Sequence, residues 1–120
     1  MAKLDLNVID KQIATDDFVA LEFKGELDKT NIEDVRSVLT RYSSELREKH
    51  LIFDLRYFNF TNSEGVGFFV SLYYSLKQAN KHLYFAQVQP QVLDVFEAVG
   101  LTKIIPIHST VDDVVSNFTK

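Results

Sequence analysis

The chain has 120 residues, no cysteine, 46% hydrophobic residues and a formal net charge of -4, and this length is typical of one domain, here residues 1–120, with a single core. The acidic balance argues against nucleic acid as a partner, because a protein that binds the phosphate backbone needs a cationic surface. The absence of cysteine excludes disulfides, thiolate catalysis and the usual zinc sites, and the charged first ten residues predict neither export nor membrane insertion, so we expect a cytoplasmic protein.

The first half of the chain predicts two strands, a helix and a buried strand. Residues 4–14 are expected to form an edge strand, and the apolar residues 18–24 a second strand that ends in a turn at the sequence GELD. Apolar residues then recur at helical spacing over residues 30–46. Residues 51–55 form a nearly continuous apolar run, which is typical of a central strand covered on both faces.

The second half of the chain alternates helices and strands. Residues 63–79 predict a helix, residues 83–88 a strand and residues 90–98 a short helix that lies between a proline and a glycine. Residues 104–107 predict the last strand, and residues 111–118 a final amphipathic helix. Strands that alternate with helices after an initial strand pair favour an α/β fold with a mixed sheet. The candidate N-caps are Thr30 or Asn31, Thr61 in a capping box with Glu64, and Ser109 or Thr110.

The most informative stretch is FNFTNSEGVGFF, residues 58–69, where polar residues separate a strand from a helix. If that helix starts at Ser63, its apolar residues share one arc that can pack on a sheet. The opposite arc is small and smooth near the hydroxyl, and Tyr74 is expected to be exposed there because Tyr73 and Tyr74 cannot both face the core. This outer arc, with its two flanking residues, contains Ser63, Glu64, Gly67, Ser71, Tyr74, Ser75 and Gln78.

Two interpretations of Ser63 follow from its place at a helix start. Backbone N–H groups and the positive end of the helix dipole meet there, and they stabilise an exposed phosphate by about 0.3–1 kcal/mol. A phosphoryl group would then be tolerated by the fold, but its charge would disrupt a partner's contact surface. The alternative is that the polar residues only cap the helix, as in most α/β domains. The spacing alone does not decide between the two.

Four motifs occur in the same order as in a known family: GELD at 25–28, LIFDL at 51–55, NSEGVG at 62–67 and VGLTKII at 99–105. With them the chain resembles the STAS family, and within it the bacterial anti-sigma factor antagonists, over nearly its whole length. The resemblance implies a mixed central sheet of about five strands with about four helices, in the order β-β-α-β-α-β-α-β-α. It also implies no enzymatic activity and no cofactor.

The resemblance further implies a partner and a modification. Antagonists of this kind bind an anti-sigma factor that is also a serine kinase of the histidine-kinase-like ATPase type, and a PP2C-type serine phosphatase reverses the phosphorylation. The family's Asp-Ser-Ser-Gly-Leu-Gly motif falls on residues 62–67, which makes Ser63 the candidate phosphoacceptor. Asn62 and Glu64 replace the family's Asp and second Ser. The family's Gly-x-Leu-Asp turn falls on residues 25–28, so Asp28 is expected near the same end of the sheet.

Other chemistry is weakly represented in the sequence. The three histidines lie in separate predicted elements without metal-ligand spacing, so we expect no metal. The acidic residues near strand ends are expected to be exposed, and no nucleophile and base converge as an enzyme would need. The histidines are His50, His82 and His108, and the acids are Glu22, Glu26, Asp28, Asp54 and Glu64.

The leading hypothesis is therefore a protein-binding switch that sequesters a kinase and anti-sigma factor when it is unphosphorylated. The expected docking surface is the end of the sheet, a loop at residues 56–64 and the outer arc of the second helix. The alternative is a STAS interaction subunit that does not switch, in a lipid-transport ATPase complex or a signalling scaffold. The predicted partner-binding residues are Asp28, Asn62, Ser63, Glu64, Gly67, Ser71 and Tyr74.

Overall fold

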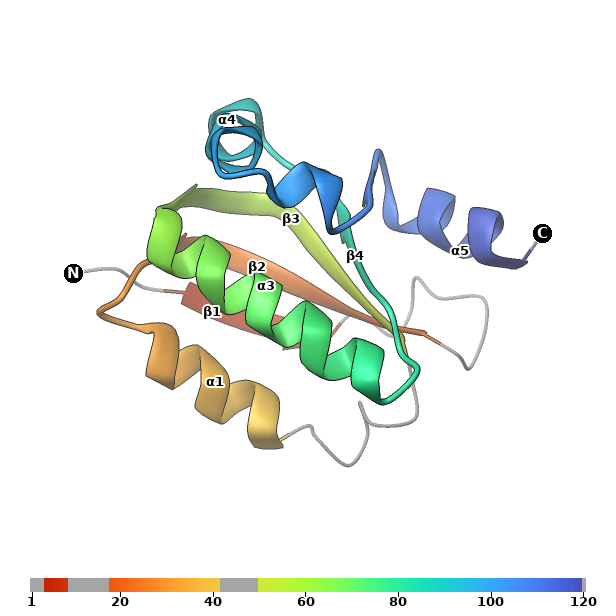
Figure 1. The fold of residues 1–120 in the computed structure, drawn as a ribbon, viewed down its shortest axis with the longest axis horizontal. Helices are drawn as coiled ribbons and strands as arrows, with labels where there is room; N and C mark the ends of the chain where they lie inside the picture. Colours follow the sequence, from red (N-terminus) through yellow and green to blue (C-terminus); the bar gives the residue numbers. More distant parts are fainter. Residues whose placement is uncertain (1–3, 9–17, 42–49, 120) are drawn as a thin grey trace.

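The computed structural model describes residues 4–8, 18–41 and 50–119. Strands and helices alternate along the chain after an initial strand pair, and Figure 1 shows their arrangement. Within the described part of the chain, none of the helices combines the length and the hydrophobicity needed to cross a bilayer. The elements are β1 (Leu4–Val8), β2 (Phe18–Leu27), α1 (Ile32–Arg41), β3 (His50–Thr61), α3 (Ser63–Gln78), β4 (Leu83–Ala86), α4 (Pro90–Ala98), the 3-10 turn η2 (Leu101–Lys103), β5 (Ile107–His108) and α5 (Val111–Thr119).

The five strands form one sheet in the order β1-β2-β3-β4-β5. β1 pairs with β2 in the antiparallel direction, and the other three pairings are parallel. Each parallel pair is joined through a helix, as crossover connections require. The predicted α/β class, the mixed sheet and the order of elements are confirmed.

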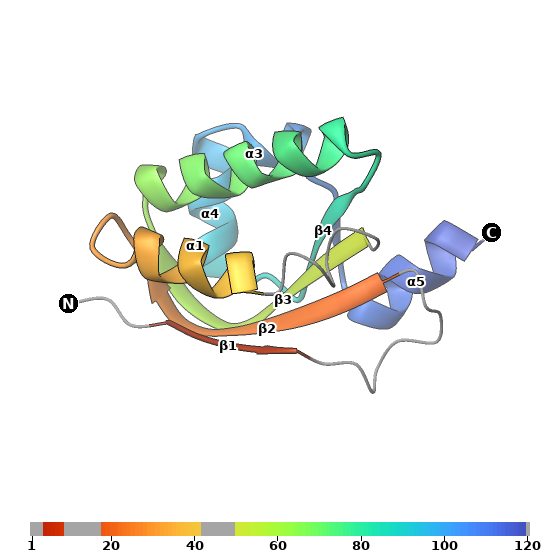
Figure 2. The ribbon, with the colours of Figure 1, turned by 90° about the horizontal axis from the view of Figure 1, so that it is seen from below.

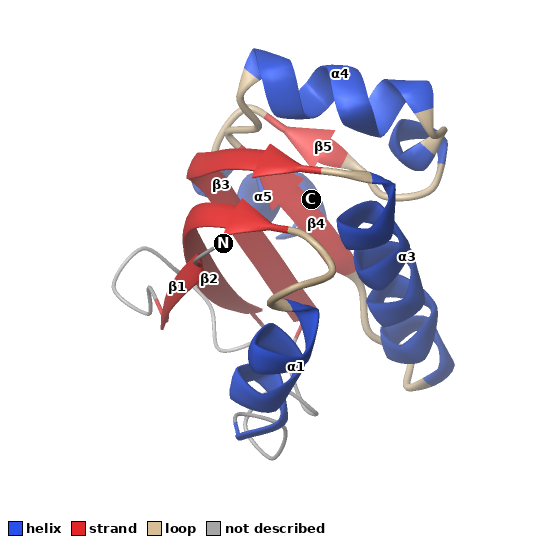
Figure 3. Cartoon of the chain, turned by 90° about the vertical axis from the view of Figure 1, so that its left-hand side faces the viewer, coloured by secondary structure: helices blue, strands red, loops and turns tan. Residues whose placement is uncertain are grey.

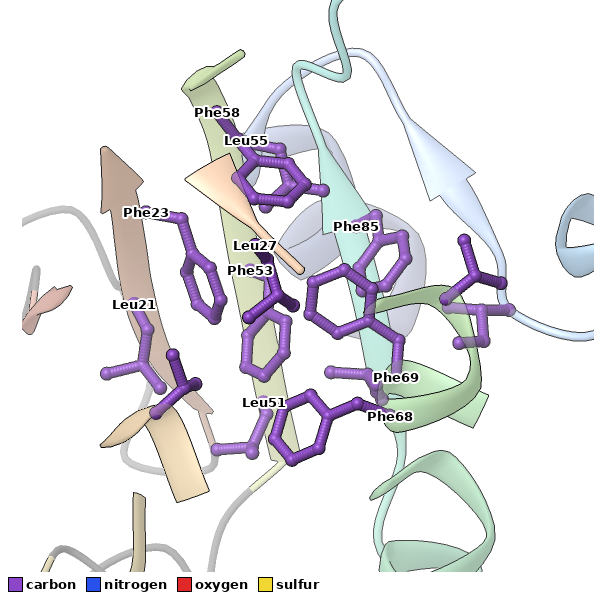
Figure 4. Close-up of a cluster of buried hydrophobic side chains, with 14 of the residues drawn as sticks. Leu21, Phe23, Leu27, Leu51, Phe53, Leu55, Phe58, Phe68, Phe69 and Phe85 are labelled. Carbon is purple, nitrogen blue, oxygen red and sulfur yellow. The ribbon is translucent and has the colours of Figure 1, made fainter. Parts of the chain in front are cut away.

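Helices cover the two faces of the sheet unequally. α1, α3 and α4 pack on one face, which we call the first face, and α5 packs on the other, the second face. Figure 2 shows α5 near the end of the sheet where β2 begins. The first face carries the main core, which Figure 4 shows in part. Phe69 of α3 lies there close to six phenylalanine rings. These rings belong to Phe23, Phe53, Phe58, Phe68, Phe85 and Phe96.

Two strands are longer than the sequence predicted. The turn expected at residues 25–28 starts later than predicted, because β2 continues through Gly25 to Leu27. Residues 56–61 belong to β3, so most of the expected loop at 56–64 is also wrong. Gly25 has a φ of 120°, which glycine tolerates, and the β2–β3 register shifts before and after it. These irregularities let the two strands stay paired where the apolar pattern fails.

The start of α4 covers the edge of β3 that extends beyond β4. The side-chain amide of Gln89 donates to the carbonyl of Arg56 at 2.7 Å, and that of Gln91 donates to the carbonyl of Asn59 at 3.3 Å. These bonds satisfy backbone groups that have no neighbouring strand. The long β3 is therefore stabilised by a contact that is distant in sequence.

The predicted final strand is largely wrong. Ile104 and Ile105 both donate their backbone N–H to the carbonyl of Leu101, at 2.9 and 3.0 Å, so they belong to the turn that directly follows η2. The strand itself is limited to Ile107 and His108. An apolar isoleucine run in a short segment does not by itself distinguish a strand from a buried turn.

Other boundaries differ less from the predictions. β4 ends at Ala86 instead of residue 88, because Gln87 adopts a left-handed backbone with a φ of 58°. The helix at 90–98 has the predicted bounds. Residues 9–14 of the predicted first strand and 42–46 of the predicted first helix lie outside the described residues.

Two of the three predicted helix caps need correction. Thr61 is buried in β3 and its hydroxyl donates to the carbonyl of Leu27 at 2.9 Å, so it forms no capping box with Glu64. Asn31 directly precedes α1, but its side chain is hydrogen-bonded to the backbone of Asp28 and Glu26 in the preceding turn. The Thr110 hydroxyl accepts the N–H of Asp113 at 3.0 Å, which confirms the cap of α5.

Candidate functional site

β3 passes into α3 through a single residue, Asn62. This residue has an extended backbone, and its side-chain oxygen accepts the N–H of Gly65 at 3.1 Å, so Asn62 is the N-cap. Ser63 is consequently the first residue of α3, and it is exposed. The predicted exposed hydroxyl at a helix start is confirmed.

The first turn of α3 lies directly against the end of β2. A Cβ added to Gly65 would meet the hydroxyl oxygen of Thr61 and, at 3.0 Å, the carbonyl oxygen of Leu27. Any residue larger than glycine would therefore push the helix away from the strand. Because Asp28 follows Leu27, this contact brings the turn after β2 to the same end of the sheet as Ser63, as Figure 3 shows.

Hydrogen bonds within the turn hold Asp28 in place. The Asp28 carboxylate accepts both the hydroxyl and the backbone N–H of Thr30, the latter at 2.8 Å, and these bonds lower the pKa of Asp28. The side chain of Asn31 accepts the N–H of Asp28 at 3.0 Å and donates to the carbonyl of Glu26 at 2.8 Å. Asp28 thus presents a fixed negative charge at neutral pH near the start of α3.

The predicted outer arc of α3 is exposed along its length. Ser63 and Ser71 are both exposed, and Tyr74 has a relative solvent exposure of 49%. A Cβ added to Gly67 would meet nothing within 4 Å, so the backbone is openly accessible there. The helical phase therefore placed these residues correctly, and whether they bind a partner or accept a phosphate stays a prediction. The exposed members of the predicted set are Ser63, Glu64, Gly67, Ser71 and Tyr74, while Asp28 and Asn62 are half-buried.

The expectation that the acids near strand ends are exposed is confirmed for Glu26 and Glu64, but it is wrong for Glu22 and Asp28, which are half-buried, and for Asp54. Asp54 lies on the second face of the sheet and is buried, with 3% exposure. Its carboxylate accepts hydrogen bonds from the backbone N–H of Arg56 at 3.1 Å and from the side-chain amide of Gln87 at 3.5 Å. Burial raises the pKa of Asp54, and the nearby Glu22 carboxylate adds to this. The apolar run at residues 51–55, which predicts a strand covered on both faces, was the signal in the sequence that pointed to this burial.

The sequence gave no sign that two of the histidines, His50 and His82, approach one another. The rings of His50 and His82 stack with centroids 5.1 Å apart, and His50 Nδ1 accepts the backbone N–H of His82 at 3.0 Å. His108 contacts the ring of Tyr84 at 5.9 Å. Pairing of β3 with β4 brings His50 and His82 together, since His50 begins β3 and His82 directly precedes β4. In the described part of the chain, no group of three or more His, Asp or Glu side chains is arranged to hold a metal ion.

The geometry defines a surface site, with an exposed residue bearing a hydroxyl at a helix start and a hydrogen-bonded turn around Asp28 at the same end of the sheet. The model of the STAS domain family matches residues 9–114. The chain therefore belongs to the STAS domain family, as its motifs predicted.

Named relatives are found by both sequence and structure. An anti-sigma-B factor antagonist from Staphylococcus epidermidis is 27% identical over 106 residues, which cover 88% of this chain and 94% of the relative. An anti-sigma factor antagonist from Mycobacterium paratuberculosis has a similar structure, with a TM-score of 0.80, 19% identity, and coverage of 98% and 96% of the two chains.

A third relative has been solved in two forms. The unphosphorylated anti-sigma factor antagonist SpoIIAA matches with a TM-score of 0.71 and 19% identity, over 99% of this chain and 96% of that one. The phosphorylated form of SpoIIAA from Bacillus matches with a TM-score of 0.62 and 19% identity, over 98% and 99%. At these identities the structures establish a shared fold.

Proposed function

We propose that this protein is a cytoplasmic anti-sigma factor antagonist controlled by phosphorylation of Ser63. In its unphosphorylated form it binds an anti-sigma factor that is also a serine kinase of the histidine-kinase-like ATPase type, and so frees a sigma factor. The kinase transfers the γ-phosphoryl group of ATP to the Ser63 hydroxyl, which loses its proton, and ADP leaves. A PP2C-type phosphatase hydrolyses the phosphoserine and restores the binding form.

The observation that carries this proposal is the exposed Ser63 hydroxyl at the first position of α3, beside the Asp28 turn. Nearby N–H groups and the helix dipole favour a phosphate there, so the fold would survive modification. The added charge of nearly two negative units would then lie on the docking rim together with Asp28 and Glu64. Desolvating that charge on contact would oppose binding.

Two substitutions test the switch against the cognate kinase. Ser63→Ala should bind it with at least the affinity of the wild type, whereas Ser63→Asp should bind at least tenfold more weakly in a titration with ADP present. Ser109 is exposed just before α5, outside the expected docking surface, so Ser109→Asp is the matched control and should bind normally. Equal binding by Ser63→Ala and Ser63→Asp would contradict the switch.

Intact-mass measurement tests the modification separately. Incubation with kinase and ATP should add one phosphoryl group to the wild type and to Ser75→Ala, and none to Ser63→Ala. If no form gains mass although the wild type binds its partner, the protein is a STAS interaction subunit without a switch. Asn62 and Glu64, which replace the family's Asp and Ser, would be the first residues to restore in that case.

A further inference from the structure

Part of the second face of the sheet has no helix over it in the described part of the chain. α5 covers the half where β2 and β3 begin, through a small cluster that includes Ile52 and Val114. Towards the other end of these strands, Figure 2 shows no described helix beneath the sheet. Two large aromatic side chains of β3 lie exposed there, Tyr57 with 44% exposure and Phe60 with 46%. Together with Val99 and Tyr74 they are the most exposed large apolar residues described.

Two cations lie over the Tyr57 ring. Lys24 pairs with Tyr57 across β2 and β3, and its Nζ lies 5.4 Å from the ring centroid. The guanidinium carbon of Arg56 is also 5.4 Å from the centroid. Lys24 makes a further contact of 3.6 Å with Glu22. The exposed Tyr57 ring thus has two cations against it, a combination that suits an apolar side chain with a neighbouring carboxylate. The positive charge is confined to this end of the surface, because Phe60 pairs with Glu26.

This surface is continuous with the rim that carries Ser63. Phe60 is followed by Thr61, whose side chain is anchored on the first face to Leu27, then by the N-cap Asn62 and by Ser63. Phe60 therefore lies at the same end of the sheet as Ser63 but on the opposite face. A partner that covers the rim around Ser63 would reach Phe60 first and Tyr57 next.

We propose that Tyr57 and Phe60, with Lys24 and Arg56, form a second part of the docking surface, which we call the aromatic strip. It binds a segment of the anti-sigma factor in which an apolar side chain lies beside a carboxylate. This proposal rests on the proposed function, because the partner is the same. Aromatic side chains are frequent hot spots in interfaces, whereas a half-exposed tyrosine and phenylalanine without a partner only expose apolar area to water.

The test is a binding titration with the cognate anti-sigma factor, supported by sedimentation of the protein alone. Tyr57→Ala and Phe60→Ala should each weaken binding about tenfold or more. Val99→Ala removes an equally exposed apolar side chain from the end of α4 and should change affinity less than twofold. The charge reversals Lys24→Glu and Arg56→Glu should weaken binding too, and the loss should shrink at high salt.

The outcomes separate this proposal from the proposed function. If Ser63→Asp abolishes binding while the strip variants bind like the wild type, the aromatic strip is wrong and the switch stands. If Ser63→Ala and Ser63→Asp bind alike but the strip variants bind weakly, the strip stands and the switch is wrong. If the strip variants alter only self-association in sedimentation, the strip contacts a second copy and our assignment is overturned. Unchanged thermal unfolding of each variant shows that the comparison concerns folded protein.

Discussion

At the scale of single residues, the most unusual side chain is the buried acid Asp54. Its burial opposes ionisation, the Glu22 carboxylate adds to that effect, and the N–H of Arg56 compensates in part. Because the pKa of Asp54 is raised in the fold above its ordinary value of 3.8, the folded state binds a proton more readily than the unfolded chain. Stability from this group is therefore greatest at low pH and falls as the pH rises through the raised pKa.

Replacing Asp54 tests this linkage. Asp54→Asn keeps an oxygen for the Arg56 N–H but cannot ionise, so its melting temperature relative to the wild type should be higher at pH 7 than at pH 4. Asp28→Asn is the matched control of opposite sign, because hydrogen bonds from Thr30 lower the pKa of Asp28. Its relative melting temperature should be lower at pH 7 than at pH 2, because the stability that a lowered pKa contributes is lost only as the pH falls below the ordinary value of 3.8. A difference for Asp54→Asn that does not vary with pH would contradict the role of burial.

At the scale of elements, the junction between β2, β3 and α3 decides where Ser63 lies. Gly65 is the contact residue, since a Cβ there would press on the Thr61 hydroxyl and on the Leu27 carbonyl. Gly65→Ala should destabilise the fold by about 1–3 kcal/mol, the usual cost of overpacking. Gly67→Ala, on the open side of the same helix, should instead stabilise it by up to about 1 kcal/mol, because alanine favours helices. Urea unfolding of both variants gives the comparison, and equal effects would mean that the close contact is unimportant.

Elements defined by local chemistry could be predicted from the sequence, and those defined by distant contacts could not. The bounds of α4 follow from a proline and a glycine, and the exposure of Ser63 follows from the phase of an amphipathic helix. The extension of β3 beyond Leu55 depends on pairing with β2 and on amides from α4, about 30 residues away. Likewise Thr61 resembles a helix cap in sequence, yet its hydroxyl bonds to Leu27, whose closeness only the fold reveals.

The candidate site divides in the same way. The first turn of α3 and the Asp28 turn were found because their motifs are continuous in sequence. The exposure of Tyr57 and Phe60 could not be predicted, since aromatic residues in a strand are usually buried and the length of α5 decides which part of the second face remains open. A regular alternation from Leu55 would also have placed Tyr57 on the first face, but the β2–β3 register shift before Tyr57 changes the phase.

At the scale of the whole molecule, α3 joins the core to the candidate docking rim. Its inner side contributes Phe69, which is fully buried and lies 5.2 Å from Phe85 between ring centroids. Its outer side carries Ser63 and Tyr74, which are exposed. Charge added on the outer side therefore need not disturb the packing that holds the helix, and this separation is what a switch without unfolding requires.

The separation predicts very different costs for substitutions on the two sides of α3. Phe69→Ala should lower the free energy of unfolding by about 3–5 kcal/mol, because it opens a cavity among six rings. Tyr74→Ala should change it by no more than about 0.5 kcal/mol, as is usual for a surface side chain, although Tyr74 contacts Tyr73. Denaturant unfolding monitored by circular dichroism measures both. A loss for Tyr74→Ala as large as that for Phe69→Ala would mean that the outer side is part of the core's support, and a charge at Ser63 would then act by loosening the fold.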